Sequence, residues 1–201
     1  YGTRRQRQMC IRDRFKDGTN VLLRDAPQVI KNAGVDALLI DQASSGGSIA
    51  DFLDIPFITI CSAVVLNQDE NVPHYSSNWK YNPAWWAKLR NRATWTFYNT
   101  LGKPIKKVVA EYRRQWYLPL YSDPNDAYSQ LAQISQQPAE LEFPRENLPK
   151  CFHFTGPYHY SDTREPVSFP WEQLTGKPLI YASMGTVQNR LVDIFYQIAA
   201  A

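Results

Sequence analysis

The sequence predicts an α/β fold, in which helices flank a parallel sheet. Short continuous apolar runs, "ALLID" (37–41) and "FITICSAV" (57–64), are typical of strands in such a sheet. Segments with a helical spacing of apolar residues precede and separate these runs. A strand, a helix and a second strand at this spacing form a right-handed βαβ unit, and the predicted class follows from it.

The first predicted elements are a helix, a strand and a second helix. Apolar residues in "NVLLRDAPQVIKNAGVD" (20–36) recur with a helical period, and Gly34 stops that helix. We expect the strand 37–41 to be buried on both faces. In "SSGGSIADFLDIP" (44–56) the serines can cap a helix that Pro56 closes. The residues expected to point inward are Ile49, Ala50, Phe52 and Leu53.

Three helices are predicted between residues 79 and 138, after a polar loop that begins at Asn67. The first keeps a helical spacing of apolar residues on one face, until Gly102 and Pro104 end it. That face consists of Trp85, Leu89, Ala93, Phe97 and Leu101. The second runs to about Trp116. The third is expected in "SDPNDAYSQLAQISQQP" (122–138), with Ser122 or Asp123 as its N-cap.

The remaining sequence predicts a domain boundary. "CFHFTGPYHY" is strand-like up to Gly156, and residues 157–177 have the Pro, Thr and Gly content of a linker. A strand "PLIYASM" and a helix "GTVQNRLVDIFYQIAA" follow, the helix with Leu191, Ile194, Phe195 and Ile198 inward. We therefore expect one domain over 15–156 and the start of another over 178–201.

Residues 1–14 are predicted to be foreign to the protein. "RRQRQMCIRDR" (4–14) matches, in frame, the translation of a transposase-type sequencing adapter. The alternative is a basic arm that binds polyanions. Without the five arginines and one aspartate of this stretch, the formal charge of +3 becomes −1.

The remaining composition gives no electrostatic reason to expect nucleic acid as a partner. Cys61 and Cys151 are expected to be reduced core residues, which suits a cytoplasmic protein. Neither a secretory signal nor an apolar run of about 18 residues is present. The last helical pattern ends without a stop signal, and we expect the chain to be incomplete at both ends.

Asp41 is the first candidate for chemistry. It ends a predicted strand and faces the glycines that start the next helix, at the carboxyl edge where open α/β sheets bind their ligands. A carboxylate there needs a cation or a hydrogen-bond donor, and a histidine is the natural one. A capping or turn aspartate is the alternative interpretation.

The turn "SMGT" (183–186) is the second candidate. Its glycine lets the backbone approach a ligand, and free N–H groups at the start of a helix favour an anion such as phosphate. Many ordinary strand-to-helix turns share this composition. The turn lacks the lysine of a Walker A loop and the three glycines of the dinucleotide fingerprint.

Other chemistries find little support. His74, His153 and His159 have no metal-ligand spacing with the cysteines, and no serine lies in a G-x-S-x-G frame. We expect the aromatic residues between Trp79 and Trp116 to pack in the core. The alternative is that they line a pocket for an apolar acceptor or contact a membrane surface.

Three stretches resemble one family, the UDP-glycosyltransferases of the two-domain, Rossmann-like B-type fold. They are "GVDALLIDQASSGGSIADFLDIPFITICSA", "EFPRENLPKCFHFTGP" and "KPLIYASMGTVQN". Within the family they resemble bacterial members similar to zeaxanthin and macrolide glucosyltransferases. The resemblance covers nearly everything after Phe15. It implies the later part of an acceptor-binding N-terminal domain and the start of a nucleotide-sugar domain.

The resemblance also implies roles for single residues. Asp41 matches an aspartate that orients a general-base histidine, which removes the proton of the acceptor hydroxyl in one inverting displacement. Ser183, Gly185 and Thr186 match the turn that contacts the diphosphate of the donor. Ser44, Trp85 and Trp86 are predicted acceptor contacts. UDP-sugar is a co-substrate, the acceptor is a lipophilic hydroxylated molecule, and neither a cofactor nor a metal is implied.

The sequence departs from the family pattern in two places. The base histidine is expected before Phe15 and the donor signature after Ala201, and neither is present. We therefore predict that this chain alone does not transfer sugar. The predicted protein is cytoplasmic, with a peripheral membrane contact. A non-catalytic α/β module that binds an apolar ligand or a membrane is the alternative, and a nicotinamide-dependent oxidoreductase is disfavoured.

Overall fold

We describe a computed structural model, which gives residues 4–160, 162, 165, 168–184 and 192–200. The chain divides into two compact units, residues 1–159 and 160–201.

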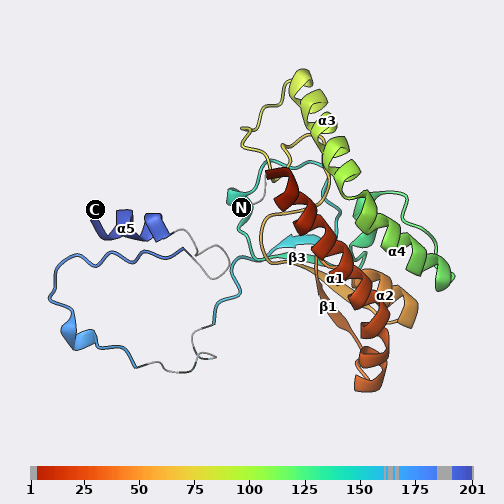
Figure 1. The fold of residues 1–201 in the computed structure, drawn as a ribbon, viewed down its shortest axis with the longest axis horizontal. Coiled ribbons are helices and arrows are strands. Elements are labelled where there is room, and N and C mark those ends of the chain that lie inside the picture. Colours follow the sequence, from red (N-terminus) through yellow and green to blue (C-terminus); the bar gives the residue numbers. More distant parts are fainter. Residues whose placement is uncertain (1–3, 161, 163–164, 166–167, 185–191, 201) are drawn as a thin grey trace. The chain divides into compact units, whose positions relative to one another are not determined.

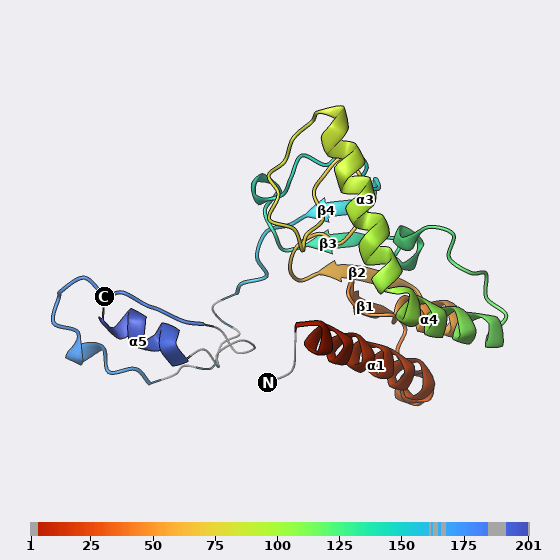
Figure 2. The same cartoon turned by 45° about the horizontal axis from the view of Figure 1, so that its top comes forward.

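The first unit is built on a four-stranded parallel sheet, as the sequence predicts. The strands are β1 (Leu38–Asp41), β2 (Phe57–Cys61), β3 (Gln133–Ser135) and β4 (Phe152–Phe154), and they lie in this order. All neighbouring pairs are parallel, and Figure 2 shows the strands side by side. The carboxyl ends of all four strands therefore meet at one edge of the sheet.

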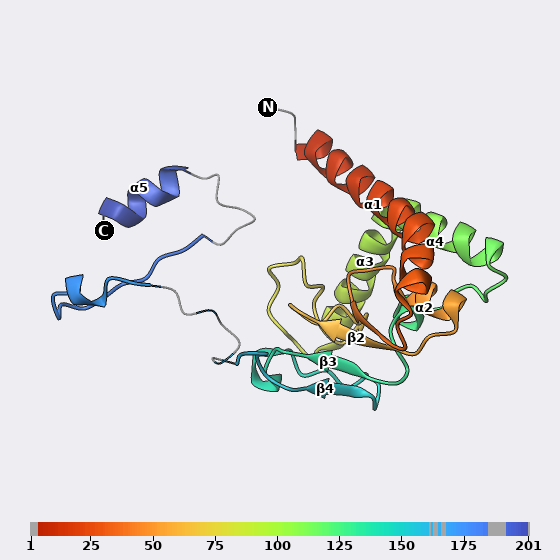
Figure 3. The ribbon, with the colours of Figure 1, turned by 90° about the horizontal axis from the view of Figure 1, so that it is seen from below.

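Helices α1 (Arg4–Ala33), α2 (Gly47–Leu53) and α4 (Lys103–Gln115) pack together over one face of this sheet (Figures 1 and 3). Their contact is an apolar core around Leu23, Ile49 and Val108. The predicted stop of α1 is confirmed, because Gly34 follows Ala33 with a φ of +62°, a conformation that favours glycine. The helix begins at Arg4, within the adapter-like residues, rather than near Asn20.

Two expectations of burial in this region are wrong. Strand β1 alternates between half-buried and exposed residues, and Leu39 is 74% exposed, because the strand lies at the edge of the sheet and the helices cover only one face. Ile49 and Ala50 are buried as predicted, whereas Phe52 is exposed and stacks on Trp116 with 4.4 Å between ring centroids.

Helix α3 (Trp85–Leu101) has its predicted bounds but buries a different face. Its buried residues are Ala87, Asn91 and Trp95, and the face that was expected to be in the core is exposed. Hydrogen bonds choose this orientation, since the Asn91 amide donates to the carbonyl of Glu70 and the Trp95 indole to that of Asp69. Polar anchoring therefore overrides the apolar periodicity of this helix.

The third predicted helix, 122–138, is wrong. Asp123 caps only a short 3-10 turn, Pro124–Ala127, in which Asp126 completes a capping box. Before β3 begins, the Ser129 hydroxyl donates to the carbonyl of Phe57. Residues Gln133–Ser135 then pair with β2 on one side and β4 on the other, and this tertiary context outweighs a weak local helix propensity. Short 3-10 turns also occur at Ala139–Leu141 and Trp171–Gln173.

The second unit contains the helix α5 (Val192–Ala200), and the start of the predicted helix lies outside the described residues. Residues 178–184 do not form the predicted strand, because the described part of this unit offers no strand for them to pair with. Phe195 and Ile198, which were expected to point inward, are exposed, and Ile194 is partly exposed. Leu191 lies outside the described residues.

Candidate functional site

Asp41 lies at the carboxyl end of β1, where the sequence predicts it, with an exposed side chain. Its Oδ1 accepts a hydrogen bond of 2.8 Å from the backbone N–H of Ala43, and its Oδ2 accepts one from the Ser62 hydroxyl. The bond to Ala43 is the side-chain turn that the alternative interpretation of this residue predicts. Each carboxylate oxygen retains accepting capacity, so the residue can hold its own turn and still receive an N–H donor.

The turn after Asp41 leads directly into α2. The N–H of Ser44 donates to the carbonyl of Asp41, and the Ser44 hydroxyl accepts from Gly46. A side chain on Gly47 would place its Cβ 2.8 Å from the carbonyl oxygen of Ala127, so glycine is required by close approach. This approach brings the segment 120–128 against the start of α2.

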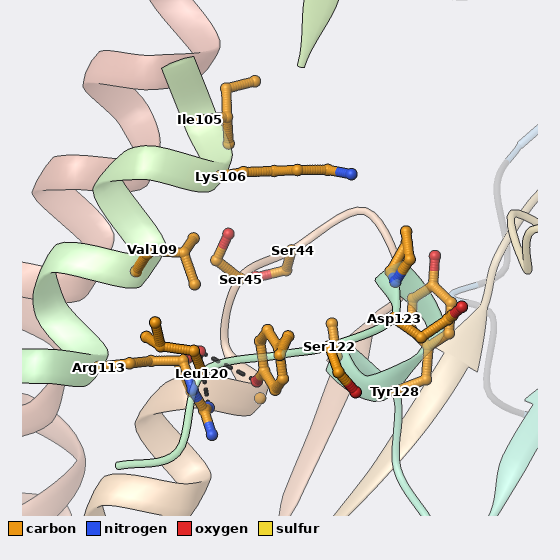
Figure 4. Close-up of a pocket in the computed structure, with 16 residues that line it drawn as sticks. Ser44, Ser45, Ile105, Lys106, Val109, Arg113, Leu120, Ser122, Asp123 and Tyr128 are labelled. Atoms are coloured by element: carbon orange, nitrogen blue, oxygen red, sulfur yellow. Dashed lines mark hydrogen bonds between the residues drawn. The ribbon is translucent and has the colours of Figure 1, made fainter. Parts of the chain in front are cut away.

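A cavity of about 500 Å³ opens beside this turn (Figure 4). Ile105, Lys106, Val109 and Arg113 of α4 line one side, and Ser122, Asp123 and Tyr128 line the other. Ser44 and Ser45 lie between the two sides. Because Ser44 follows β1, the cavity lies at the carboxyl edge of the sheet, which is the ligand-binding edge in open α/β folds. Its mixture of apolar walls and a few polar groups suits a small hydroxylated molecule.

Two cations of α4 set the charge of the cavity. Arg113 is buried, and its guanidinium donates to Asp51 at 2.6 Å, to the Ser48 hydroxyl at 3.2 Å and to the carbonyl of Pro119 at 2.7 Å. It also stacks on the ring of Tyr121 at 3.9 Å. Arg113 therefore stabilises the cavity wall, since its charge is paired with Asp51 and three of its five N–H groups donate to protein acceptors.

Lys106 is the cation that remains available to a ligand. Its ammonium donates to the Asn99 side chain at 2.8 Å and keeps further donor capacity. Partial desolvation lowers the pKa of Lys106, and Asp123 opposes that shift. Figure 4 shows the side chain extending from α4 into the space above Ser44 and Ser45.

The other predicted acceptor residues do not lie at this cavity. Trp85 and Trp86 are exposed at the start of α3, and neither lines the cavity that Ser44 lines. The structure thus separates the three predicted acceptor residues into two places.

None of the described histidines forms a hydrogen bond with Asp41, whose side chain accepts from Ala43 and Ser62. His74 is buried between the rings of Tyr75 and Tyr98, and its Nδ1 accepts from the N–H of Ser76. Burial lowers the pKa of His74 to about 4, which makes it a weak base. His153 lies on β4, three strand spacings from β1, or about 14 Å. Within the described part of the chain, no group of three His, Cys, Asp or Glu residues is placed to hold a metal ion.

The predicted donor turn is only partly described. Ser183 lies in the second unit and is exposed, whereas Gly185 and Thr186 lie outside the described residues. Their role stays a prediction.

Sequence reasoning missed Lys106, Arg113 and Tyr121. A signal was present, because positions 106, 109 and 113 share one helix face and combine two cations with an apolar residue. Cys61 and Cys151 are free thiols, as predicted, and burial raises the pKa of Cys61 to about 11.

Comparison with known proteins adds a family relationship. No model of a protein family matches the sequence. The chain is 33% identical over 184 residues to a zeaxanthin glucosyltransferase of Pantoea ananas, covering 91% of this chain and 43% of that protein. A zeaxanthin glucosyltransferase of Pseudescherichia vulneris is 32% identical over 184 residues, covering 91% and 44% respectively. The chain spans less than half the length of these relatives. As its motifs predict, this chain is related by descent to the glycosyltransferases.

Proposed function

We propose that the chain is the acceptor-binding part, with the beginning of the nucleotide-sugar part, of an inverting UDP-sugar-dependent hexosyltransferase. The relatives' names support a glucosyl group and a carotenoid acceptor. The observation that carries the proposal is the exposed Asp41 carboxylate at the carboxyl edge of the sheet, on the turn that also forms a cavity wall. The proposed place of action is the cytoplasm, where UDP-sugars are made.

In the proposed reaction Asp41 is a positioning residue. Its carboxylate accepts the N–H of a histidine, fixes the tautomer of the imidazole and stabilises the imidazolium that forms. The other ring nitrogen takes the proton of the acceptor hydroxyl. The acceptor oxygen then forms a bond to the anomeric carbon as the bond to UDP breaks, which inverts the configuration. Asp41 itself is a poor base for an alcohol, because an ordinary aspartate has a pKa of about 3.9.

When the bond to the sugar breaks, negative charge develops on the diphosphate of the leaving UDP. We propose that Ser183, Gly185 and Thr186 contact it, since N–H groups at the start of a helix favour phosphate oxygens. This scheme uses no cofactor, and the chemistry needs no metal.

The cavity beside Ser44 is the proposed acceptor site. Ile105, Val109 and Leu120 offer an apolar wall for a hydrocarbon ring. Ser44 and Lys106 offer donors that can fix a hydroxyl group of the acceptor. An acceptor bound there would present its hydroxyl toward the turn that begins at Asp41.

A chimera tests the proposal directly. The chain replaces the matching part of the Pantoea ananas relative, which supplies the remaining length. We expect the folded chimera to transfer glucose from UDP-glucose to zeaxanthin with inversion at the anomeric carbon, whereas the 201-residue chain alone should not. The unaltered relative is the positive control. A chimera with native-like circular dichroism and no transfer to any hydroxylated carotenoid or phenolic acceptor would contradict the proposal.

A variant of the chimera locates the acceptor. Ser44→Trp should narrow the cavity and raise the KM for zeaxanthin at least about tenfold, with the KM for UDP-glucose unchanged. Ala139→Trp, at an exposed position that does not line the cavity, is the matched control. Equal effects of the two variants would place the acceptor elsewhere.

A further inference from the structure

Helix α3 carries a continuous apolar stripe on its exposed face. The stripe comprises Trp85, Leu89, Ala93, Phe97 and Leu101, at a spacing of four residues. Trp85 is 77%, Leu89 58% and Phe97 60% exposed. Single exposed apolar side chains are normal, but an uninterrupted row along a helix of 17 residues marks an interaction surface.

Hydrogen bonds of the opposite face fix the rotation of α3 about its axis, and this rotation exposes the stripe. Asn91 and Trp95, on the opposite face, are buried and donate to the backbone carbonyls of Glu70 and Asp69 at 3.1 and 2.9 Å. Rotating α3 so that the stripe faced inward would break both of these hydrogen bonds and leave the two carbonyls without these donors. Figure 1 shows the first turns of α3 at one end of the first unit, and the exposed fractions of Trp85, Leu89 and Phe97 show that the stripe is accessible.

Aromatic residues widen the stripe at the start of the helix. Trp86 is exposed beside Trp85, and the exposed Trp79 of the preceding loop is held near it by Arg90. The Arg90 guanidinium lies 4.5 Å from the Trp79 ring centroid and 5.7 Å from that of Trp86. Three tryptophans are therefore gathered at one end of the stripe.

Positive charge flanks the stripe. Lys88 and Arg92 form the adjacent exposed row of α3, and Lys80 is exposed in the loop. Between positions 79 and 116 the sequence contains nine Lys and Arg residues and a single acidic residue, Glu111. Arg92 is paired with Glu70, so the positive charge beside the stripe comes chiefly from Lys80, Lys88 and Arg90. This sign complements an anionic surface.

We infer that the stripe of α3 docks on the surface of an anionic lipid bilayer, with the helix lying in the interface. Tryptophans concentrate at membrane interfaces, and an exposed apolar helix face flanked by Lys and Arg is the pattern of a peripheral anchor. Among the described residues no helix is long and apolar enough to cross a bilayer. A second copy of the chain is a poorer occupant, because two such faces would bring like charges together. The inference rests on the surface alone and does not require the proposed function.

Vesicle sedimentation of the 201-residue chain tests the inference, with vesicles of phosphatidylcholine alone or with about 30% phosphatidylglycerol. We expect binding to the anionic vesicles at least about tenfold tighter than to the neutral ones, and weakened by 0.5 M NaCl because salt screens exposed charges. Leu89→Ser with Phe97→Ser should weaken binding at least about tenfold, since both side chains lose their apolar contact with lipid.

The matched control is Leu131→Ser with Leu141→Ser, two leucines of the same unit that are 66% and 75% exposed and lie outside α3. This control should bind as the unaltered chain does. Three results would overturn the inference: equal loss in both double variants, equal binding to neutral and anionic vesicles, or no binding together with a dimer that the α3 double variant dissociates in sedimentation velocity. The vesicle assay measures no sugar transfer, so its failure is distinct from failure of the proposed function.

Discussion

Two regions of the first unit are held together by different chemistry. The contact between α1, α2 and α4 is apolar, with Leu23, Ile49 and Val108 at its centre. The contact between β2, β3 and the loop after Asn67 is a buried hydrogen-bond network, in which Asn67 donates to Gln133 at 3.0 Å and Arg145 pairs with Glu142 at 3.0 Å. The first kind of contact is non-directional, whereas the second tolerates few partners.

The difference between the two contacts indicates which region tolerates substitutions. An apolar core accepts other residues of similar volume, whereas a half-satisfied polar network is costly. Asn67 Oδ1 and Asp69 Oδ2 already lack a hydrogen-bond partner among the described residues. We therefore expect losses in the network to exceed comparable losses in the helix layer.

Removing the Arg145 side chain should have the largest effect. Its guanidinium pairs with the buried Glu142 and donates to the carbonyls of Asn67 and Val65. Arg145→Met leaves the buried Glu142 charge unpaired and removes the Arg145 donors from both carbonyls, and we expect a loss of about 3–5 kcal/mol in the free energy of unfolding by urea. Adding Glu142→Leu should restore part of it. A loss below about 1 kcal/mol would mean that the network is not the stronger constraint.

Truncating the centre of the helix layer should cost somewhat less. Ile49→Ala removes a buried side chain and leaves a space between three helices. We expect a loss of about 2–5 kcal/mol in the same urea experiment. Leu141→Ala, at an exposed position, should stay within about 0.5 kcal/mol of the unaltered chain. If the two variants behaved alike, the apolar core described here would be wrong.

A third expected effect is a dependence on pH from His74, which lies in the loop of the polar region. Its folded pKa of about 4 is below the ordinary 6.5, so between these values the unfolded chain binds a proton that the folded chain does not. Stability should therefore rise as pH increases from about 4 to 6.5. His74→Phe, which keeps a ring between Tyr75 and Tyr98, should flatten that rise in urea midpoints. An unchanged slope in the variant would show that His74 is not buried in its neutral form.

The same contrast explains what the sequence could predict. The positions of α2, α3 and α4, the end of α1 and the first two strands follow from apolar periodicity and from stops such as Gly34, because those signals are local. The buried face of α3 and the strand β3 do not, because Asn91, Trp95 and Gln133 are placed by hydrogen bonds to distant segments. When the hydrogen-bond partners of a helix are not known, apolar periodicity alone can predict the wrong buried face, as it does for α3.

The candidate site divides in the same way. Asp41 was predictable, because the end of a strand in a βαβ unit can be located from the local sequence pattern. The cavity was not, because its walls come from segments far apart in the chain. Ser48 contacts Tyr121 across 73 positions and Arg113 across 65.

The central claim is that the charge of Asp41 serves sugar transfer rather than only its own turn. Asp41→Asn in the chimera is the most direct measurement, because the amide oxygen can still accept from Ala43 while the charge is lost. We expect kcat to fall by about 10²- to 10⁴-fold, with the KM for UDP-glucose and the urea midpoint unchanged. Asp36→Asn, exposed before the same strand, is the control and should keep full activity. A kcat within about twofold of the unsubstituted chimera would contradict the claim.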